Sequence, residues 1–179
     1  AAAHLGAGRV VIGRDTRESG LSLARALAQG LVVGGLDVTS LGVVPTPAVA
    51  HECYVDGVAG AVVSASHNPW FDNGIKLFAA GGHKLDDRVQ SAVQETWDAY
   101  PRLNELTPMP DWHDPEDPTA GGRRWVDALI AGVIEGPTVG QAGDLPLAGQ
   151  SLVVDCANGA TSSFAVDVLR RLGAEVGVL

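Results

Sequence analysis

Residues 58–76 of the chain read VAGAVVSASHNPWFDNGIK, an apolar run followed directly by a polar loop. The run at 58–63 has the length and composition of a buried strand. Residues 64–69 are residue types that favour a loop, and Gly74 precedes a second short apolar run at 75–79. The stretch therefore predicts a strand whose carboxyl end carries hydrogen-bonding side chains.

Strand-like and helix-like segments alternate on both sides of this stretch. Further short apolar runs predict strands at 10–12, 38–41 and 152–154. Apolar residues at helical spacing predict helices around 23–31, 48–53, 89–100, 125–133 and 164–172. Ser19 and Asp86 are residue types that cap helices at their start, and Gly34 with Gly35 is typical of a helix end. This alternation predicts an α/β fold with three layers (α/β/α) around a mixed, mainly parallel sheet.

The pattern divides the chain into two unequal parts. We predict one domain at 1–140, a linker rich in Gly and Pro at 141–149, and the first β-α-β portion of a second, similar domain at 150–179. Residues 101–120 contain five prolines and predict a surface crossing. The second part is too short to build its own core, so we expect it either to pack on the first or to fray. We also expect the chain to begin within a fold, with residues 1–4 as the tail of a helix.

Composition and charge limit the classes of function. The 179 residues are 46% hydrophobic and 18% charged, which is typical of a globular protein, and the formal net charge is −9 at pH 7. An acidic protein is poorly suited to nucleic acid and to anionic membranes, so we expect neither as a partner. Two cysteines without metal-type spacing, no apolar run of membrane-spanning length and no export signal predict a cytoplasmic location.

The segment Ser64-Ala65-Ser66-His67-Asn68-Pro69, continued by Trp70-Phe71-Asp72-Asn73-Gly74-Ile75-Lys76, resembles the active-serine loop of the phosphohexomutase superfamily. Members of this superfamily have four domains and move a phosphoryl group between the 1- and 6-positions of a hexose, by way of a phosphoserine and a bisphosphate. The resemblance implies that Ser66 is the phosphoserine and that Lys76 is an active-site residue and a candidate general acid/base.

The residue types support the same chemistry. A serine on a loop after a strand presents its oxygen to a cleft, where backbone N–H groups can receive phosphoryl oxygens. His67 and Asn68 add hydrogen-bond donors, and Gly74 lets Lys76 point back towards the phosphate. Two other interpretations are weaker. Ser-His-Asn-Pro alone is also a common turn sequence, and a serine hydrolase would need a Gly-x-Ser-x-Gly sequence that Ser66 lacks.

Three further stretches resemble the same superfamily. Gly13-Arg14-Asp15-Thr16-Arg17-Glu18-Ser19-Gly20 looks like the loop after the first strand, and it can face the same cleft as Ser66. Residues 42–47 resemble a strand-to-helix link that reads as a rigid turn, and residues 153–160 resemble the opening of the second domain. An Arg-Asp-x-Arg cluster either contacts phosphate or forms an internal ion-pair network that fixes a loop. We favour the structural role, with Arg17 as the better functional candidate of the two arginines.

The predicted site therefore has named residues and roles. Ser66, Lys76 and His67 are predicted to be catalytic, and Arg17 and Asn68 to bind substrate or phosphate. The resemblance also implies Mg²⁺ as the cofactor, with the phosphate on Ser66 supplying a metal ligand.

Within the superfamily, the serine loop and the stretch Ala79-Ala80-Gly81-Gly82-His83-Lys84-Leu85 look most like the bacterial branch that interconverts glucosamine 6-phosphate and glucosamine 1-phosphate for cell-wall precursors. Branches acting on mannose or glucose phosphates remain the alternative, as does a non-catalytic binding or assembly module. The expected partner is a phosphorylated hexose or hexosamine, and the full-length protein could form a homodimer. This chain alone is expected to be inactive, because the family's metal, sugar and distal phosphate loops are not in it.

Overall fold

The computed structural model of the chain describes residue 5 and residues 8–99, 112–136 and 145–179. The predicted helix tail at 1–4, much of the predicted crossing at 101–120 and the first half of the predicted linker at 141–149 lie outside the described residues.

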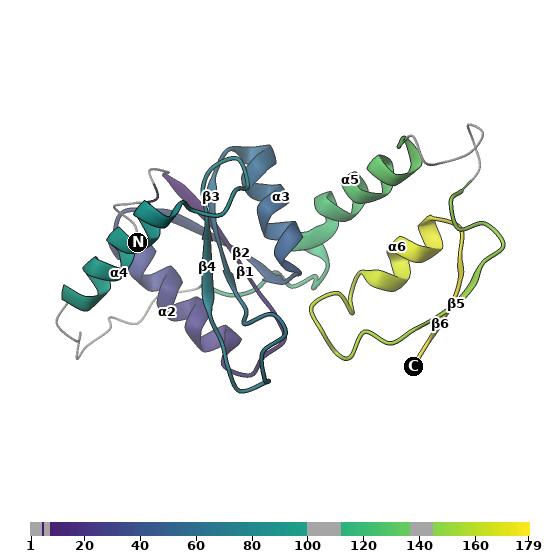
Figure 1. Cartoon of the computed structure of the whole chain (residues 1–179), viewed down its shortest axis with the longest axis horizontal. Coiled ribbons are helices and arrows are strands. Elements are labelled where there is room, and N and C mark those ends of the chain that lie inside the picture. The colour runs from purple at the N-terminus through teal and green to yellow at the C-terminus, as the bar shows by residue number, and fades with distance from the viewer. Residues whose placement is uncertain (1–4, 6–7, 100–111, 137–144) are drawn as a thin grey trace.

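The described elements follow the predicted alternation of strands and helices (Figure 1). The strands are β1 (Arg9–Arg14), β2 (Asp37–Val43), β3 (Ala59–Val63), β4 (Ile75–Phe78), β5 (Ser151–Val154) and β6 (Glu175–Val178). The helices are α2 (Gly20–Val33), α3 (Thr46–Asp56), α4 (Asp87–Ala99), α5 (Arg123–Ile134) and α6 (Ala165–Arg171).

The main sheet has the strand order β2-β1-β3-β4. β1 runs parallel to both β2 and β3, and β4 returns antiparallel to β3. The predicted mixed, mainly parallel sheet is therefore confirmed. Because β1, β2 and β3 run in the same direction, the loops that follow them all emerge at one edge of the sheet.

Helices cover both faces of this sheet, which confirms the three-layer arrangement. Alternate residues of one strand point to opposite faces. Val10 and Ile12 of β1 pack in the cluster that includes Ala24, Ala28 and Leu31 of α2. The residue between them, Val11, packs instead with α3 in a cluster with Ala48, Val49 and Cys53. Figure 1 shows α2 and α3 on opposite sides of the sheet.

Two local predictions differ from the structure. Ser19 occupies the N-cap position of α2, but its side chain makes no capping bond; its Oγ accepts a hydrogen bond of 3.0 Å from Asn73 Nδ2 of the serine loop. Asp86 does cap α4, because its carboxylate accepts from the backbone N–H of Val89 at 2.9 Å. The predicted apolar face of α4 is not buried: Val89 packs partly on the core, whereas Trp97 is 78% exposed.

Helix α5 is joined to α3 by ion pairs. Arg124 of α5 donates to Glu52 at 2.8 Å and to Asp56 at 2.9 Å. Burial raises the pKa of the Glu52 carboxyl, and the adjacent Arg124 opposes that rise.

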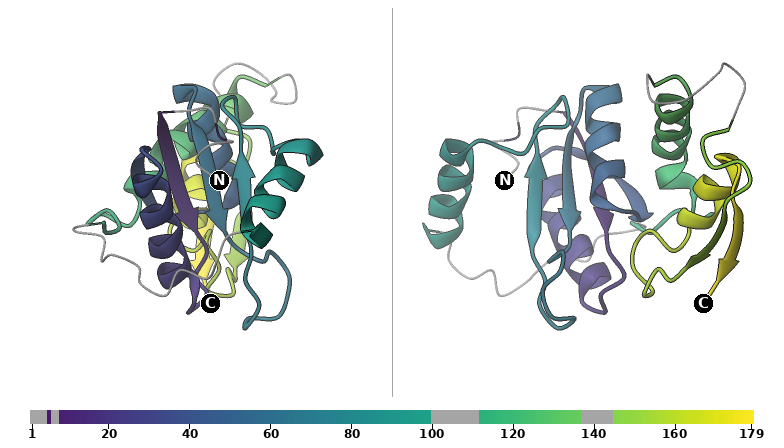
Figure 2. Two further views of the ribbon diagram at one scale, coloured as in Figure 1. Left: turned by 90° about the vertical axis from the view of Figure 1, so that its left-hand side faces the viewer. Right: turned by 45° about the vertical axis from the view of Figure 1, so that its right-hand side comes forward.

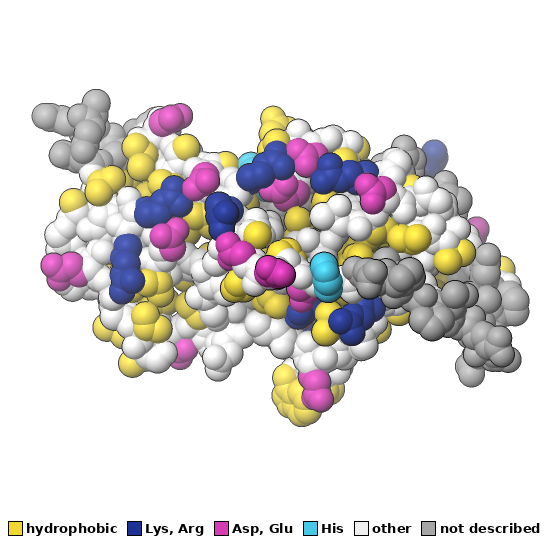
Figure 3. All heavy atoms as spheres, turned by 180° about the vertical axis from the view of Figure 1, so that it is seen from behind, with side chains coloured by type: hydrophobic (Ala, Val, Ile, Leu, Met, Phe, Trp, Pro, Cys, Tyr) yellow, Lys and Arg dark blue, Asp and Glu magenta, His cyan; other side chains and the backbone are white. Residues whose placement is uncertain are grey.

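On the face in Figure 3, basic and acidic side chains are interspersed and do not gather into one basic patch. No helix in the described part of the chain is both long and apolar enough to cross a membrane.

The C-terminal part packs on the main sheet layer through α5. β5 and β6 are parallel and form a separate two-stranded sheet, with α6 between them in the chain, as the predicted β-α-β portion requires. Phe164, at the start of α6, is only 3% exposed and meets the ring of Trp125 edge to face at 6.2 Å. Figure 2 shows this part beyond α3, on the side away from α4. The division into domains at 141–149 stays a prediction.

Close packing between β3 and α3 leads to a stability prediction. A Cβ added at Gly60 would overlap Cys53 Sγ and lie 3.1 Å from Val49 Cγ1. Burial raises the pKa of the Cys53 thiol to about 11, so it remains a neutral core side chain. Gly60→Ala should therefore lower the free energy of unfolding by about 1–3 kcal/mol.

The matched control is Gly30→Ala in α2, where nothing lies within 4 Å of the added Cβ. That change should raise the free energy of unfolding by about 0.5–1 kcal/mol, because alanine is the better helix former. Urea unfolding followed by circular dichroism measures both variants. Equal stability of the two would contradict the packing described here.

Candidate functional site

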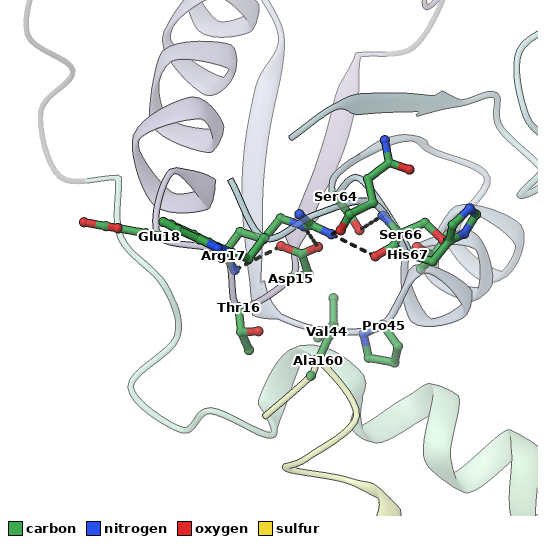
Figure 4. A pocket seen from close by; sticks show the side chains of 14 residues that line it. Asp15, Thr16, Arg17, Glu18, Val44, Pro45, Ser64, Ser66, His67 and Ala160 are labelled. Atoms are coloured by element: carbon green, nitrogen blue, oxygen red, sulfur yellow. Dashed lines mark hydrogen bonds and ion pairs between the residues drawn. The ribbon is translucent and has the colours of Figure 1, made fainter. Parts of the chain in front are cut away.

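The loops at the carboxyl edge of the sheet surround one pocket of about 680 Å³. Asp15, Thr16, Arg17 and Glu18 follow β1; Val44, Pro45 and Thr46 follow β2; Ser64, Ser66, His67, Asn68 and Trp70 follow β3; and Gly159 and Ala160 follow β5. Figure 4 shows Arg17 and Asp15 pointing towards the serine loop, with Ala160 approaching from the C-terminal part. The prediction that the loop after β1 and the serine loop after β3 face one cleft is confirmed.

The serine loop at 64–74 is closed by its own backbone. Ser64 N–H donates to the carbonyl of Gly74 at 2.8 Å, which joins the two ends of the loop. Two turns lie inside, closed by the bonds from Asn68 N to the Ala65 carbonyl at 3.1 Å and from Asp72 N to the Pro69 carbonyl at 3.0 Å. The loop is therefore a folded unit at the end of β3.

Ser66 is the residue of this loop with an unusual backbone. Its φ of 57° lies in the left-handed region, which serine rarely adopts. Its N–H donates to Ser64 Oγ at 3.1 Å, a bond that holds this conformation. The side chain is exposed, and Oγ lies 3.3 Å from His67 Nδ1. A strained residue that presents its hydroxyl to a pocket is a frequent arrangement at reactive sites.

The Arg17 side chain binds the backbone of the serine loop. A guanidinium group has five N–H donors. In this structure Nε donates to Asp15 at 3.0 Å, and the terminal nitrogens donate to the carbonyl oxygens of Ser66 at 2.8 Å, Asn68 at 2.9 Å, Asp72 at 2.8 Å and Pro69. The Arg17 side chain is only 10% exposed, and Asp15 offsets its charge. All five donors thus hold the loop and its neighbour Asp15.

The structure brings together four of the five predicted site residues. Ser66, His67, Asn68 and Arg17 line the pocket. Lys76 does not: it lies on β4 opposite Val62, is exposed, and its side chain has no hydrogen bond or ion pair within the described residues. The predicted contact of Arg17 with a substrate phosphate stays a prediction; in this structure its side-chain donors are engaged by Asp15 and the loop carbonyls.

A metal ion would find few protein ligands in this part of the chain. Among the described residues, no group of three or more His, Cys, Asp and Glu side chains is arranged to hold a metal. Asp15 and Glu18 line the pocket, but both Asp15 oxygens accept hydrogen bonds from Arg17, and Glu18 points away from Ser66 in Figure 4. The predicted Mg²⁺ site is therefore not supplied by these residues alone.

Sequence reasoning missed the contribution of the C-terminal part to the pocket. Gly159 and Ala160 belong to a loop in which Ala157 and Asn158 both have positive φ values, 46° and 53°. The loop reaches the pocket because Phe164 packs against Trp125 and Gly122, where an added Cβ would lie 2.6 Å from the Phe164 ring. The unusual Asn158-Gly159 turn was visible in the sequence, but its position beside Ser66 depends on long-range packing.

Comparisons with known proteins agree with this geometry. Residues 1–102 match the sequence model described as phosphoglucomutase/phosphomannomutase, alpha/beta/alpha domain I. The chain is 42% identical to the phosphoglucosamine mutase of Bifidobacterium adolescentis over 96% of this chain and 37% of that protein. It is 44% identical to the phosphoglucosamine mutase of Saccharopolyspora erythraea over 93% of this chain and 35% of that protein. The chain thus spans little more than a third of these relatives.

A solved structure gives the same picture for the fold. A Thermus thermophilus protein provisionally named phosphomannomutase superposes with a TM-score of 0.75 at 28% sequence identity, covering 99% of this chain and 38% of that one. The family match covers more than half of the chain, including the β1 loop and the whole serine loop. This chain therefore belongs to the phosphoglucomutase/phosphomannomutase family, which is the phosphohexomutase superfamily that its serine loop resembles.

Proposed function

We propose that the protein containing this chain is a cytoplasmic phosphoglucosamine mutase, which interconverts glucosamine 6-phosphate and glucosamine 1-phosphate in the synthesis of amino-sugar nucleotides and cell-wall precursors. The observation that carries this proposal is the exposed Ser66 hydroxyl, which lines a pocket on a loop held by the donors of one arginine. The names of the relatives support the choice of the sugar.

Ser66 would act as the phosphoryl carrier. The bond between phosphorus and Ser66 Oγ breaks while a bond forms from phosphorus to a hydroxyl oxygen of the sugar, which gives a bisphosphate. The phosphoryl group that the substrate carried originally is then transferred from the bisphosphate to Ser66 Oγ, and the product monophosphate is released. Phosphoryl transfer depends mainly on positioning and on stabilisation of charge, so a loop that fixes the serine serves this reaction directly.

Each transfer also moves a proton from the attacking hydroxyl, and two residues are candidates to accept it. His67 Nδ1 lies 3.3 Å from Ser66 Oγ, within reach of the carrier oxygen. Lys76 is the candidate that the family resemblance suggests, and it would have to reach the pocket from β4. We propose that both residues serve the reaction, with Asn68 as a hydrogen-bond donor to phosphate.

We also propose that Mg²⁺ is the cofactor and that it offsets the charge of the phosphate on Ser66. Ser66 would supply one ligand through a phosphate oxygen. The remaining ligands would come from beyond the residues described here, because these contain no metal-binding group of side chains. No contact of the ion with this chain other than the phosphate is proposed.

A second activity within the family is the isomerisation of mannose or glucose phosphates. The family description and the Thermus thermophilus relative favour this alternative. A panel of glucosamine, glucose and mannose 6-phosphates, assayed with the full-length protein, decides between them. The highest kcat/KM for glucosamine 6-phosphate supports the proposal, whereas a higher value for another sugar selects the alternative.

The first prediction from the proposed function concerns Ser66. The purified full-length protein should carry phosphate on Ser66, and Ser66→Ala should lower turnover by at least about a thousandfold, because the carrier oxygen is lost. Intact mass, peptide mapping and a coupled mutase assay measure these effects.

Ser66→Gly separates the effect of losing the hydroxyl from the effect of backbone strain at this position. Glycine suits the φ of 57°, so this variant should be as inactive as Ser66→Ala and at least as stable. Stoichiometric phosphate on another residue, together with full activity of Ser66→Ala, would remove Ser66 from its proposed role.

The second prediction concerns Lys76. Lys76→Met should lower turnover by about 10² to 10⁴, as expected for loss of a positioned acid/base. The melting temperature should hardly change, because the Lys76 side chain is exposed and has no hydrogen bond or ion pair within the described residues. Lys84→Met is the matched control, since Lys84 is also exposed and does not line the pocket. Unchanged turnover of Lys76→Met would exclude it from catalysis.

The third prediction concerns the 179-residue chain alone, which should show no measurable mutase activity. Arg17 is the only lysine or arginine that lines the pocket in the described part, and its donors hold the loop. Few groups thus remain to position the sugar and its second phosphate, and positioning accounts for about 7–11 kcal/mol of the barrier in such reactions. A coupled assay with glucosamine 6-phosphate, Mg²⁺ and a hexose bisphosphate, beside the full-length protein, tests this. Turnover within tenfold of that protein would overturn it.

A further inference from the structure

Two large aromatic side chains project from the serine loop into solvent. Trp70 is 74% exposed and Phe71 is 67% exposed. Their rings meet edge to face, with centroids 5.7 Å apart and an interplanar angle of 79°. Neither side chain contributes to the two hydrophobic clusters around the sheet. Burial in the core of this fold therefore does not explain why the loop carries them.

The loop that carries this pair is fixed on both sides of it. The Arg17 guanidinium donates to the carbonyl of Pro69, directly before Trp70, and to the carbonyl of Asp72 at 2.8 Å, directly after Phe71. The turn bond from Asp72 N to the Pro69 carbonyl closes around the same two residues. The aromatic pair is therefore presented on a folded turn, in which the two rings pack edge to face.

Trp70 also lines the pocket that contains Ser66. The two positions are four apart in the sequence, so their Cα atoms are at most about 14 Å apart, and less along a folded turn. An indole at this place adds apolar surface to a pocket whose nearby groups are mostly polar: Ser64, Ser66, His67 and Asn68. Ligand sites commonly combine such an aromatic surface with a few polar groups that fix orientation.

We propose that Trp70 is a substrate-positioning residue whose indole face stacks on the apolar C–H face of the hexopyranose ring while the hydroxyl that accepts the phosphoryl group lies near Ser66. This inference rests on the proposed function and names the part of the sugar that this loop contacts. A pyranose with equatorial hydroxyls exposes axial C–H groups on its faces, and these match the negative face of an aromatic ring. The stacking fixes the ring without using any of the donors that Arg17 has committed to the loop.

The test compares a ring with an open chain that carries the same phosphate. The full-length protein is assayed with glucosamine 6-phosphate as substrate and with glucitol 6-phosphate as a competitive inhibitor, since the hexitol keeps the phosphate and hydroxyls but has no ring face. Trp70→Ala should raise KM about tenfold and leave kcat within about threefold, as expected when binding is lost equally in the ground and transition states. Ki for glucitol 6-phosphate should change by less than about twofold.

Two further variants sharpen the result. Trp70→Phe keeps a smaller aromatic face and should give an intermediate KM. Trp97→Ala is the matched control, because Trp97 is similarly exposed at 78% but lies on α4 and does not line the pocket; its KM should equal that of the unsubstituted protein. Melting temperatures of all three should stay nearly unchanged, since exposed side chains are replaced.

Three outcomes would overturn the inference. An unchanged KM in Trp70→Ala would show that the ring does not meet the indole. Equal rises of KM and of Ki for the hexitol would show that the loop, not the ring contact, was lost. A change of oligomeric state in sedimentation, with KM unchanged, would assign the aromatic pair to a protein contact instead. Absence of turnover by the unsubstituted protein with every hexose phosphate is a separate result, which removes the proposed function and this inference with it.

Discussion

The contact between the Arg17 guanidinium and the carbonyl oxygens of the serine loop is the constraint on which the candidate site depends. The carbonyl oxygens of Ser66, Asn68, Pro69 and Asp72 all point at this one side chain, which is only 10% exposed. One cation satisfies four of them and is itself neutralised by Asp15. The position of Ser66, the exit of the loop towards β4 and the presentation of the aromatic pair all follow from this one arrangement.

The sheet decides which loops can take part. β1, β2 and β3 are parallel, so their carboxyl ends place the Arg17 loop, the turn at Pro45 and the serine loop around one pocket. The C-terminal part completes the pocket only because Phe164 is seated against Trp125 on α5. Helix α5 is in turn tied to α3 by Arg124. The pocket thus depends on a series of contacts within the hydrophobic cluster that joins α3, α5 and Phe164.

The elements of the fold were predictable, and several contacts of the site were not. Alternating apolar runs and glycine or proline punctuation located the strands and helices, and the polar residues after β3 located Ser66. Arg17 was recognised as a candidate, but its partners are backbone carbonyls, which every residue possesses and which leave no sequence pattern. Lys76 follows the serine loop closely in sequence, yet it lies on an antiparallel edge strand outside the pocket lining. The exposure of Trp97 was likewise not visible from the helical spacing of α4.

Recognition of the loop through its backbone has a consequence for how such a protein can diversify. Arg17 contacts the main chain of Ser66, Asn68, Pro69 and Asp72, and none of these four bonds uses a side-chain atom of the loop. Side chains at the tip of the loop can therefore be exchanged during evolution while the scaffold beneath them keeps its shape. Selection on ligand preference and selection on folding then act on separate atoms of the same short segment, so a new preference can arise without a compensating change elsewhere in the chain.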